Sequence, residues 1–219
     1  MTLTPPNAEP AALDTDTADT DTADGDVVDV DVDLDWVEAQ LGPDPGWQEM
    51  HHPPARRDLE PRRRRHGTGR FVPTEPNRSL ALRCYRRVSD GAIVGKAWFG
   101  PEAGGPPGFA HGGAQMAVLD HAFGAAAWSC GLPVVTASMT YDFLRGLPIG
   151  TVARVEAVVE SVEGRKVRTR GRLLDADGHV FGEGHALFVT MSDEARRKLG
   201  AARPDGDVPA RADAEETAG

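Results

Sequence analysis

The stretch that decides the fold is Pro106-Pro107-Gly108-Phe109-Ala110-His111-Gly112-Gly113, and it runs directly into a helical pattern. Apolar residues then recur at three- and four-residue steps, which is typical of one face of an amphipathic helix. These residues are Met116, Leu119, Phe123, Ala126 and Ala127. The two final glycines stand where the helix begins, so their N–H groups have no partner within it and lie at the positive end of its dipole. The sequence therefore predicts a helix start that can stabilise a developing oxyanion.

One acidic residue, Asp120, falls within the apolar stripe of this helix and is expected to be largely desolvated. A buried carboxylate is costly unless it is hydrogen-bonded or takes part in chemistry. It is either a salt-bridged residue behind an ordinary helix cap or one half of a catalytic pair with Gly112. Asp120 follows Gly112 by eight residues, which is ~12 Å along a helix that rises ~1.5 Å per residue. If both groups act on one carbonyl, they must come from two chains, which predicts a two-fold dimer.

Strand patterns flank the helix on both sides. Residues 80–87 and 92–99 are expected to form a hairpin around Ser89-Asp90-Gly91. After the helix, which should end near Cys130, residues 135–143 alternate strictly, and Thr136 is expected on the face opposite five apolar or aromatic residues, Val135, Ala137, Met139, Tyr141 and Phe143. Further strands are predicted at 151–162, 166–174 and 179–191. One long helix wrapped by a curved antiparallel sheet, an α+β architecture, fits this order.

The charge is unevenly distributed along the chain. Residues 1–35 carry ten aspartates and Glu9 with no lysine or arginine, while the whole chain has a formal net charge of −10. Such a low-complexity segment cannot bury enough apolar area to fold, so we expect a disordered acidic tail. A helix and loop extension is predicted over 36–78, one domain over 79–195 and a disordered tail over 196–219.

Several function classes are disfavoured by composition. The chain has no signal-peptide pattern and no apolar run of the ~20 residues that span a bilayer, so a soluble, cytoplasmic protein without membrane contact is expected. Cys84 and Cys130 are too few for a disulfide framework. The run Arg62-Arg63-Arg64-Arg65 lacks interleaved aromatic residues, which favours a solvated loop over nucleic-acid binding. No metal or other cofactor is predicted, because no cysteine or carboxylate stands at metal-ligand spacing from His51, His52 and His66.

These features together resemble the hot-dog-fold acyl-CoA thioesterases, specifically the branch of the phenylacetyl-CoA thioesterases and the mammalian thioesterase superfamily members. The resemblance covers about residues 80–192. Its first elements are the Gly108–Gly113 stretch and the acid nine residues after His111. The others are Thr136 sixteen residues after that acid, Arg145 followed by Pro148, and Glu163-Gly164-Arg165-Lys166.

The resemblance implies hydrolysis of an acyl-CoA thioester by a homodimer, or a tetramer built from it. Asp120 would be the general base or the nucleophile, and the Gly112 amide would polarise the carbonyl. His111 would help to shape the carbonyl site, and Thr136 would orient the carboxylate or its water. Substrate binding would fall to Gly113, Arg145, Arg165 and Lys166, with the cations facing the phosphates of CoA.

Other interpretations stay open at this point. The domain could bind or sense acyl-CoA without hydrolysing it, or act on an acyl-carrier protein. A dehydratase on the same fold is a third alternative. Three further arginines, Arg168, Arg170 and Arg172, alternate along one predicted strand. For these three an exposed, solvated sheet face is favoured over a role in CoA binding.

Overall fold

The computed structural model describes residues 32–50, 71–192 and 194–195. Most of the predicted tails, the arginine run and the three histidines between residues 51 and 66 lie outside these ranges. The first described residues, from 32 on, lie within the segment that was predicted as the acidic tail. Helix α1 (Leu34–Gln40) is capped by Asp33, whose side chain accepts a hydrogen bond from the Trp36 amide at 2.9 Å. A capping aspartate inside an acidic repeat has no distinctive sequence signal.

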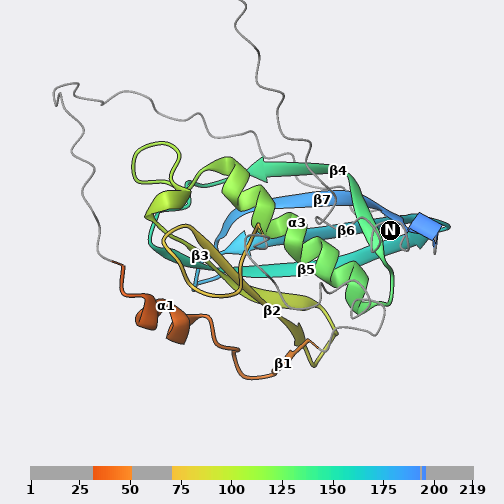
Figure 1. Ribbon diagram of the computed structural model, residues 1–219, viewed down its shortest axis with the longest axis horizontal. Coiled ribbons are helices and arrows are strands. Elements are labelled where there is room, and N and C mark those ends of the chain that lie inside the picture. Colours follow the sequence, from red (N-terminus) through yellow and green to blue (C-terminus); the bar gives the residue numbers. More distant parts are fainter. Residues whose placement is uncertain (1–31, 51–70, 193, 196–219) are drawn as a thin grey trace, which may run out of the picture. The chain divides into compact units, whose positions relative to one another are not determined.

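The described residues form one antiparallel sheet of seven strands in the order β1-β2-β3-β5-β6-β7-β4 (Figure 1). The predicted hairpin and the three-stranded meander are confirmed. The strand that follows the central helix crosses to the far edge of the sheet, where it pairs with β7. The strands are β1 (Trp47–Glu49), β2 (Leu80–Arg87), β3 (Ile93–Phe99), β4 (Val134–Phe143), β5 (Thr151–Glu163), β6 (Lys166–Leu174) and β7 (Val180–Thr190).

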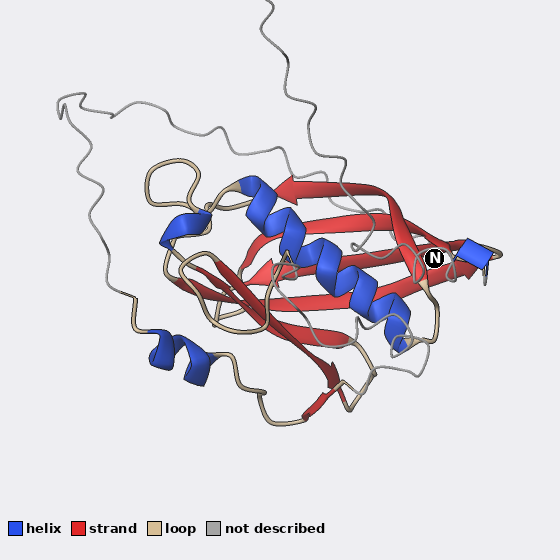
Figure 2. Cartoon of the chain, in the orientation of Figure 1, coloured by secondary structure: helices blue, strands red, loops and turns tan. Residues whose placement is uncertain are grey.

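Helix α3 (Gly112–Ser129) lies across one face of the sheet, and the strands curve around it (Figures 1 and 2). A short 3-10 turn, η1 (Pro101–Ala103), leads into the loop before it. Leu119 and Phe123 have no exposed surface and pack in the core between helix and sheet. Strand β6 passes close to them, because a Cβ added at Gly171 would lie 2.7 Å from the Phe123 ring. The predicted hot-dog architecture, a long helix wrapped by a curved antiparallel sheet, is confirmed.

The buried face of α3 differs in detail from the prediction. Met116 and Asp120 are only half-buried, whereas the buried positions include Gln115, Val118, Leu119, Ala122 and Phe123. Alanine and glycine make this helix apolar nearly all round, so the hydrophobic period marks no single face. Even so, no helix in the described part of the chain has both the length and the hydropathy of a membrane span.

The N-terminal extension packs on the part of the sheet face opposite α3 that β2 and β3 form. Glu38 of α1 forms an ion pair with Arg83 at 2.6 Å, and the Tyr85 hydroxyl donates a hydrogen bond to the Leu41 carbonyl at 2.8 Å. Apolar side chains of α1 meet β2 and β3 in a second cluster of Val37, Leu41, Ala81 and Trp98. Helix α1 and the residues at its C-terminal end are thereby held against β2 and β3.

The packing of the core predicts that two phenylalanine-to-alanine substitutions differ strongly in their effect on the free energy of unfolding. Phe123→Ala should lower the free energy of unfolding by about 3–5 kcal/mol, because it leaves a cavity between α3 and β6. Phe71→Ala is the matched control, since the Phe71 side chain is 85% exposed, and its effect should stay within about 0.5 kcal/mol. Urea unfolding at one protein concentration measures both, and equal losses would contradict this description of the core.

Candidate active site

His111 caps the N-terminus of α3. Its Nδ1 accepts a hydrogen bond from the Gly113 amide at 2.9 Å. An acceptor at Nδ1 leaves the hydrogen of the neutral imidazole on Nε2, so the exposed ring presents an N–H donor outward. The helix start predicted from the sequence is confirmed, and the hydrogen of the Gly113 amide is used in the bond to the capping side chain.

The Gly112 amide has no acceptor among the described residues. The backbone before it is held on both sides, because the His111 amide donates to the Ala103 carbonyl and the Ala110 amide to the Leu147 carbonyl, each at 2.8 Å. An aromatic ring stands beside it, since a Cβ added at Gly112 would lie 2.8 Å from Phe143. An unpaired N–H in a fixed frame at a helix start is the arrangement that stabilises an oxyanion.

Asp120 accepts a hydrogen bond from the Thr136 hydroxyl at 2.7 Å. The predicted strong desolvation is not seen in the single chain, where Asp120 is half-buried beside the packed face of α3. It forms no ion pair with any described residue. The carboxylate is therefore oriented by one donor and keeps its second oxygen for other chemistry.

A β-bulge in β4 turns Thr136 toward the helix. The pairing of β4 with β7 shifts register between Thr136 and Ser138. The prediction of strict alternation over 135–143 is wrong here, because Tyr141 also bonds α3, at the Gln115 side chain. Residues five apart cannot share a face of a regular strand, and the extra residue of the bulge allows it.

The structure does not bring Gly112 and Asp120 together within one chain. Gly112 lies against Phe143 at the end of β4, whereas Asp120 bonds Thr136 near its beginning. Seven residue steps separate Thr136 from Phe143, which is roughly 20 Å along a strand. We call the first group, His111, Gly112 and Phe143, the donor half-site, and the second, Asp120 and Thr136, the acid half-site.

The predicted CoA-binding cations are likewise divided. Arg145 lies over the Phe181 ring at 4.5 Å and donates to Asp175 at 2.7 Å, and this hydrogen bond holds the pKa of Asp175 below its usual range. Arg165 donates to the Thr190 carbonyl at 3.0 Å. Lys166 is exposed at the start of β6, whereas Asp175 follows the end of that strand. Arg145 thus belongs with the donor half-site, and Arg165 and Lys166 lie toward the acid half-site.

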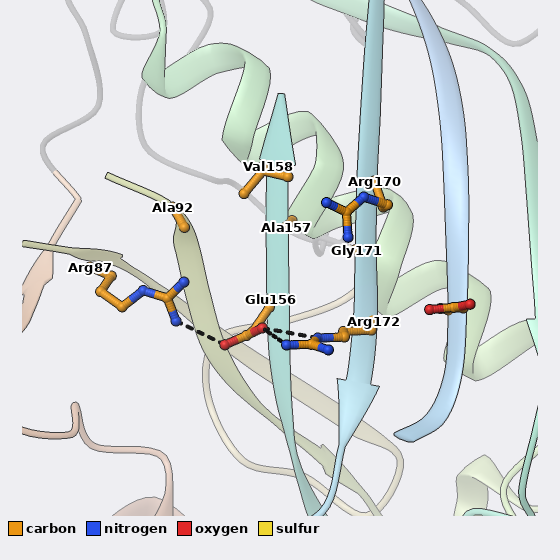
Figure 3. A pocket seen from close by; sticks show the side chains of 9 residues that line it. Arg87, Ala92, Glu156, Ala157, Val158, Arg170, Gly171 and Arg172 are labelled. Carbon is orange, nitrogen blue, oxygen red and sulfur yellow. Dashed lines mark hydrogen bonds and ion pairs between the residues drawn. The ribbon is translucent and has the colours of Figure 1, made fainter. Parts of the chain in front are cut away.

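The arginines of β6 face away from α3, as predicted for a solvated sheet face. Arg170 and Arg172 border a pocket of about 230 Å³ in which Arg87 and Arg172 both bond Glu156 (Figure 3). Burial opposes ionisation of Glu156, but the hydrogen bonds from Arg172 and Arg87 outweigh it and lower the pKa of this carboxyl. The charged side chains of this pocket therefore pair with one another, and the pocket lies on the sheet face opposite both half-sites.

One group of described residues has the spacing of metal ligands. Atoms of Asp175, Asp177 and His179 lie within 4.8 Å of one another. Asp175 is already engaged, because one oxygen accepts from the Asp177 and His179 amides and the other from Arg145. The group forms a tight turn that holds Arg145, a role that the sequence analysis did not foresee.

Comparisons with known proteins find similarity to thioesterases. Residues 107–181 match the model of the thioesterase superfamily. The acyl-coenzyme A thioesterase THEM4 of Xenopus laevis is 39% identical over 94 residues, which are 42% of this chain and 42% of the relative. The chain thus spans less than half the length of this curated relative.

Two solved structures are also similar. A crystal structure of a thioesterase superfamily protein is 31% identical, with 50% of this chain and 53% of that chain covered and a TM-score of 0.48. The Escherichia coli PaaI protein from the phenylacetic acid degradation operon is 18% identical, with 52% and 80% covered and a TM-score of 0.46.

The cap predicts the stability of variants at His111. His111→Ala should lower the free energy of unfolding by about 0.5–2 kcal/mol, because the Gly113 amide loses its acceptor. His111→Asn, whose side-chain oxygen can cap the same amide, should recover most of that loss. Thermal and urea unfolding measure both variants. An asparagine variant as unstable as the alanine variant would show that the ring does not act as the cap.

Proposed function

From the premise that residues 107–181 belong to the thioesterase superfamily, we propose that this protein hydrolyses acyl-CoA thioesters to a carboxylic acid and CoA. The observation that carries the proposal is the combination of an unpaired helix-start amide at Gly112 with a hydrogen-bonded carboxylate at Asp120. The curated relative is named an acyl-coenzyme A thioesterase, which supports CoA thioesters as the substrate class.

Thioester hydrolysis needs a carboxylate that activates the attacking oxygen and a hydrogen-bond donor that stabilises the oxyanion. Acting as general base, Asp120 takes a proton from a water whose oxygen attacks the thioester carbonyl carbon. The Gly112 N–H, and the Nε2–H of His111, stabilise the negative oxygen of the tetrahedral intermediate. The carbon–sulfur bond then breaks, and the thiolate of CoA receives the proton. If Asp120 attacks directly, its oxygen forms a mixed anhydride with the acyl group as the carbon–sulfur bond breaks and the CoA thiolate leaves, and water then cleaves the anhydride to the acid and the free Asp120 carboxylate.

The active unit in this proposal is a dimer related by a two-fold axis. Each chain holds a donor half-site and an acid half-site at opposite ends of β4. A two-fold axis near the middle of β4 places the donor half-site of one chain beside the acid half-site of the other. The same operation places Arg145 of one chain on the side of Arg165 and Lys166 of its partner, which gathers the cations for the phosphates of CoA.

Strand β4 and helix α3 offer the surface for this pairing. β4 is an edge strand, and no charged residue or proline occurs between Val134 and Tyr141. Such an edge is a template for pairing with another strand. Val135 and Phe143 are 47% and 57% exposed. On α3, a Cβ added at Gly124 would meet nothing within 4 Å, so a second helix can approach closely there.

Removal of the carboxylate tests the mechanism. Asp120→Asn should lower kcat by about 100-fold or more, because the amide cannot accept a proton from water, while the dimer stays intact. Free thiol release from a panel of acyl-CoAs measures the rate, and sizing at several concentrations measures the dimer. Unchanged turnover would remove Asp120 from the reaction, and acyl-CoA binding without turnover in the unmodified protein would favour a sensor.

Mixed dimers test whether the site is shared. Asp120→Asn and Gly112→Pro should each be nearly inactive. Proline is tolerated at the first helical position but has no N–H, and its Cβ also displaces the tip of the Phe143 ring in the same half-site. Mixed dimers regain one intact site, so a statistical mixture should recover about a quarter of the unmodified activity per chain. Asp120→Asn mixed with Asp120→Ala is the control and should recover none. A monomeric, fully active protein would refute the shared site.

A further inference from the structure

A hydrogen-bonded pair, the buried Gln115 and the half-buried Tyr141, links the donor half-site to β4. Gln115 is 4% exposed and lies in the first turn of α3. Its Oε1 accepts a hydrogen bond from the Tyr141 hydroxyl at 2.8 Å. Its Nε2 lies 3.5 Å from the Ala110 carbonyl, at the limit of a hydrogen bond. Both ends of the amide are therefore directed at backbone or side chains around the helix start.

Gln115 completes the frame around the Gly112 amide. The amides of Ala110 and His111 are bonded to the Leu147 and Ala103 carbonyls, and Gln115 reaches the Ala110 carbonyl. The Gly112 N–H shares its planar peptide unit with the His111 carbonyl, which accepts hydrogen bonds from the Ala114 and Gln115 amides at 2.9 and 3.3 Å, so the direction of this N–H is fixed together with that carbonyl. The Gly112 amide is the group in this frame that is left without an acceptor among the described residues.

Tyr141 also contacts the aromatic ring of the donor half-site. Its ring meets the Phe143 ring edge to face, with centroids 4.5 Å apart, and Phe143 lies against Gly112. Burial raises the pKa of Tyr141, which keeps the hydroxyl a hydrogen-bond donor at neutral pH. One side chain therefore braces both the helix start and the aromatic ring over it.

We propose that Tyr141 and Gln115 are positioning residues that hold the Gly112 amide and the Phe143 ring in place for the thioester carbonyl. The inference rests on the proposed function and deepens it. Two apolar side chains could fill the same space, but they would not fix the register of a bulged edge strand. A directional hydrogen bond between buried groups does so.

Three variants separate positioning from stability. Tyr141→Phe and Gln115→Met each leave one buried polar group without its partner, and each should lower both stability and kcat, with kcat falling about tenfold and KM nearly unchanged. The double variant Y141F/Q115M leaves neither partner and should regain thermal stability. Its kcat should stay low, because the register is no longer fixed. A double variant that regains both would overturn the proposal.

Tyr85→Phe is the matched control. Tyr85 is at least as buried as Tyr141, and its hydroxyl also donates a hydrogen bond at 2.8 Å, but to Leu41 in the extension on the opposite sheet face. It should lower stability without lowering kcat. An equal fall in kcat for Tyr85→Phe and Tyr141→Phe would show a general effect of lost hydroxyls and would overturn the proposal.

A measurement without substrate keeps this inference separate from the proposed function. Amide hydrogen exchange of residues 106–116 should become faster in Tyr141→Phe and Gln115→Met, and stay unchanged in Tyr85→Phe. If the unmodified protein hydrolyses no acyl-CoA but this pattern is found, the proposed function fails and the frame around Gly112 stands. Unchanged exchange in Tyr141→Phe would overturn the positioning role itself.

Discussion

Strand β4 must present Thr136 and Tyr141 to the same helix although five positions separate them, and the rest of the site depends on this constraint. In a regular strand, side chains an odd number of positions apart point to opposite faces. The bulge between Thr136 and Ser138 adds one residue to β4, so the Thr136 and Tyr141 side chains can point to the same face of the strand. Without it, either Asp120 would lose its donor or Gln115 would lose Tyr141. The bulge thus makes both half-sites compatible with one strand.

The sequence was sufficient for the architecture because the relevant signals are local. The turn at Asp90-Gly91 requires a positive φ at Gly91, which the structure has at 74°. Strand β6 alternates regularly, so Arg168, Arg170 and Arg172 could be placed on the solvated face. The start of α3 was equally readable, since two glycines after a capping residue leave backbone donors free wherever the helix packs.

The details of the site depend on tertiary contacts and were not predictable in this way. A bulge in an edge strand is set by its partner β7, and no residue of β4 marks it. The burial of Asp120 was overestimated because the small residues of α3 conceal which face meets the sheet. Gln115 stands out in the sequence as an uncharged polar residue in the first turn of a largely apolar helix, next to Met116. Its hydrogen-bond partner Tyr141 is 26 positions away, so the contact between them could not be predicted.

A hydrogen bond between buried groups contributes little net stability, so the Tyr141–Gln115 pair is better understood through the states that it disfavours. An edge strand that is paired on one side only, with a bulge near its start, can slip by one residue at moderate cost. A slip would turn Phe143 away from Gly112 and Thr136 away from Asp120 together. Apolar packing tolerates such a shift, whereas the Tyr141 hydroxyl and the buried Gln115 amide lose their partners at once. The polar pair therefore makes the register that forms both half-sites the stable one.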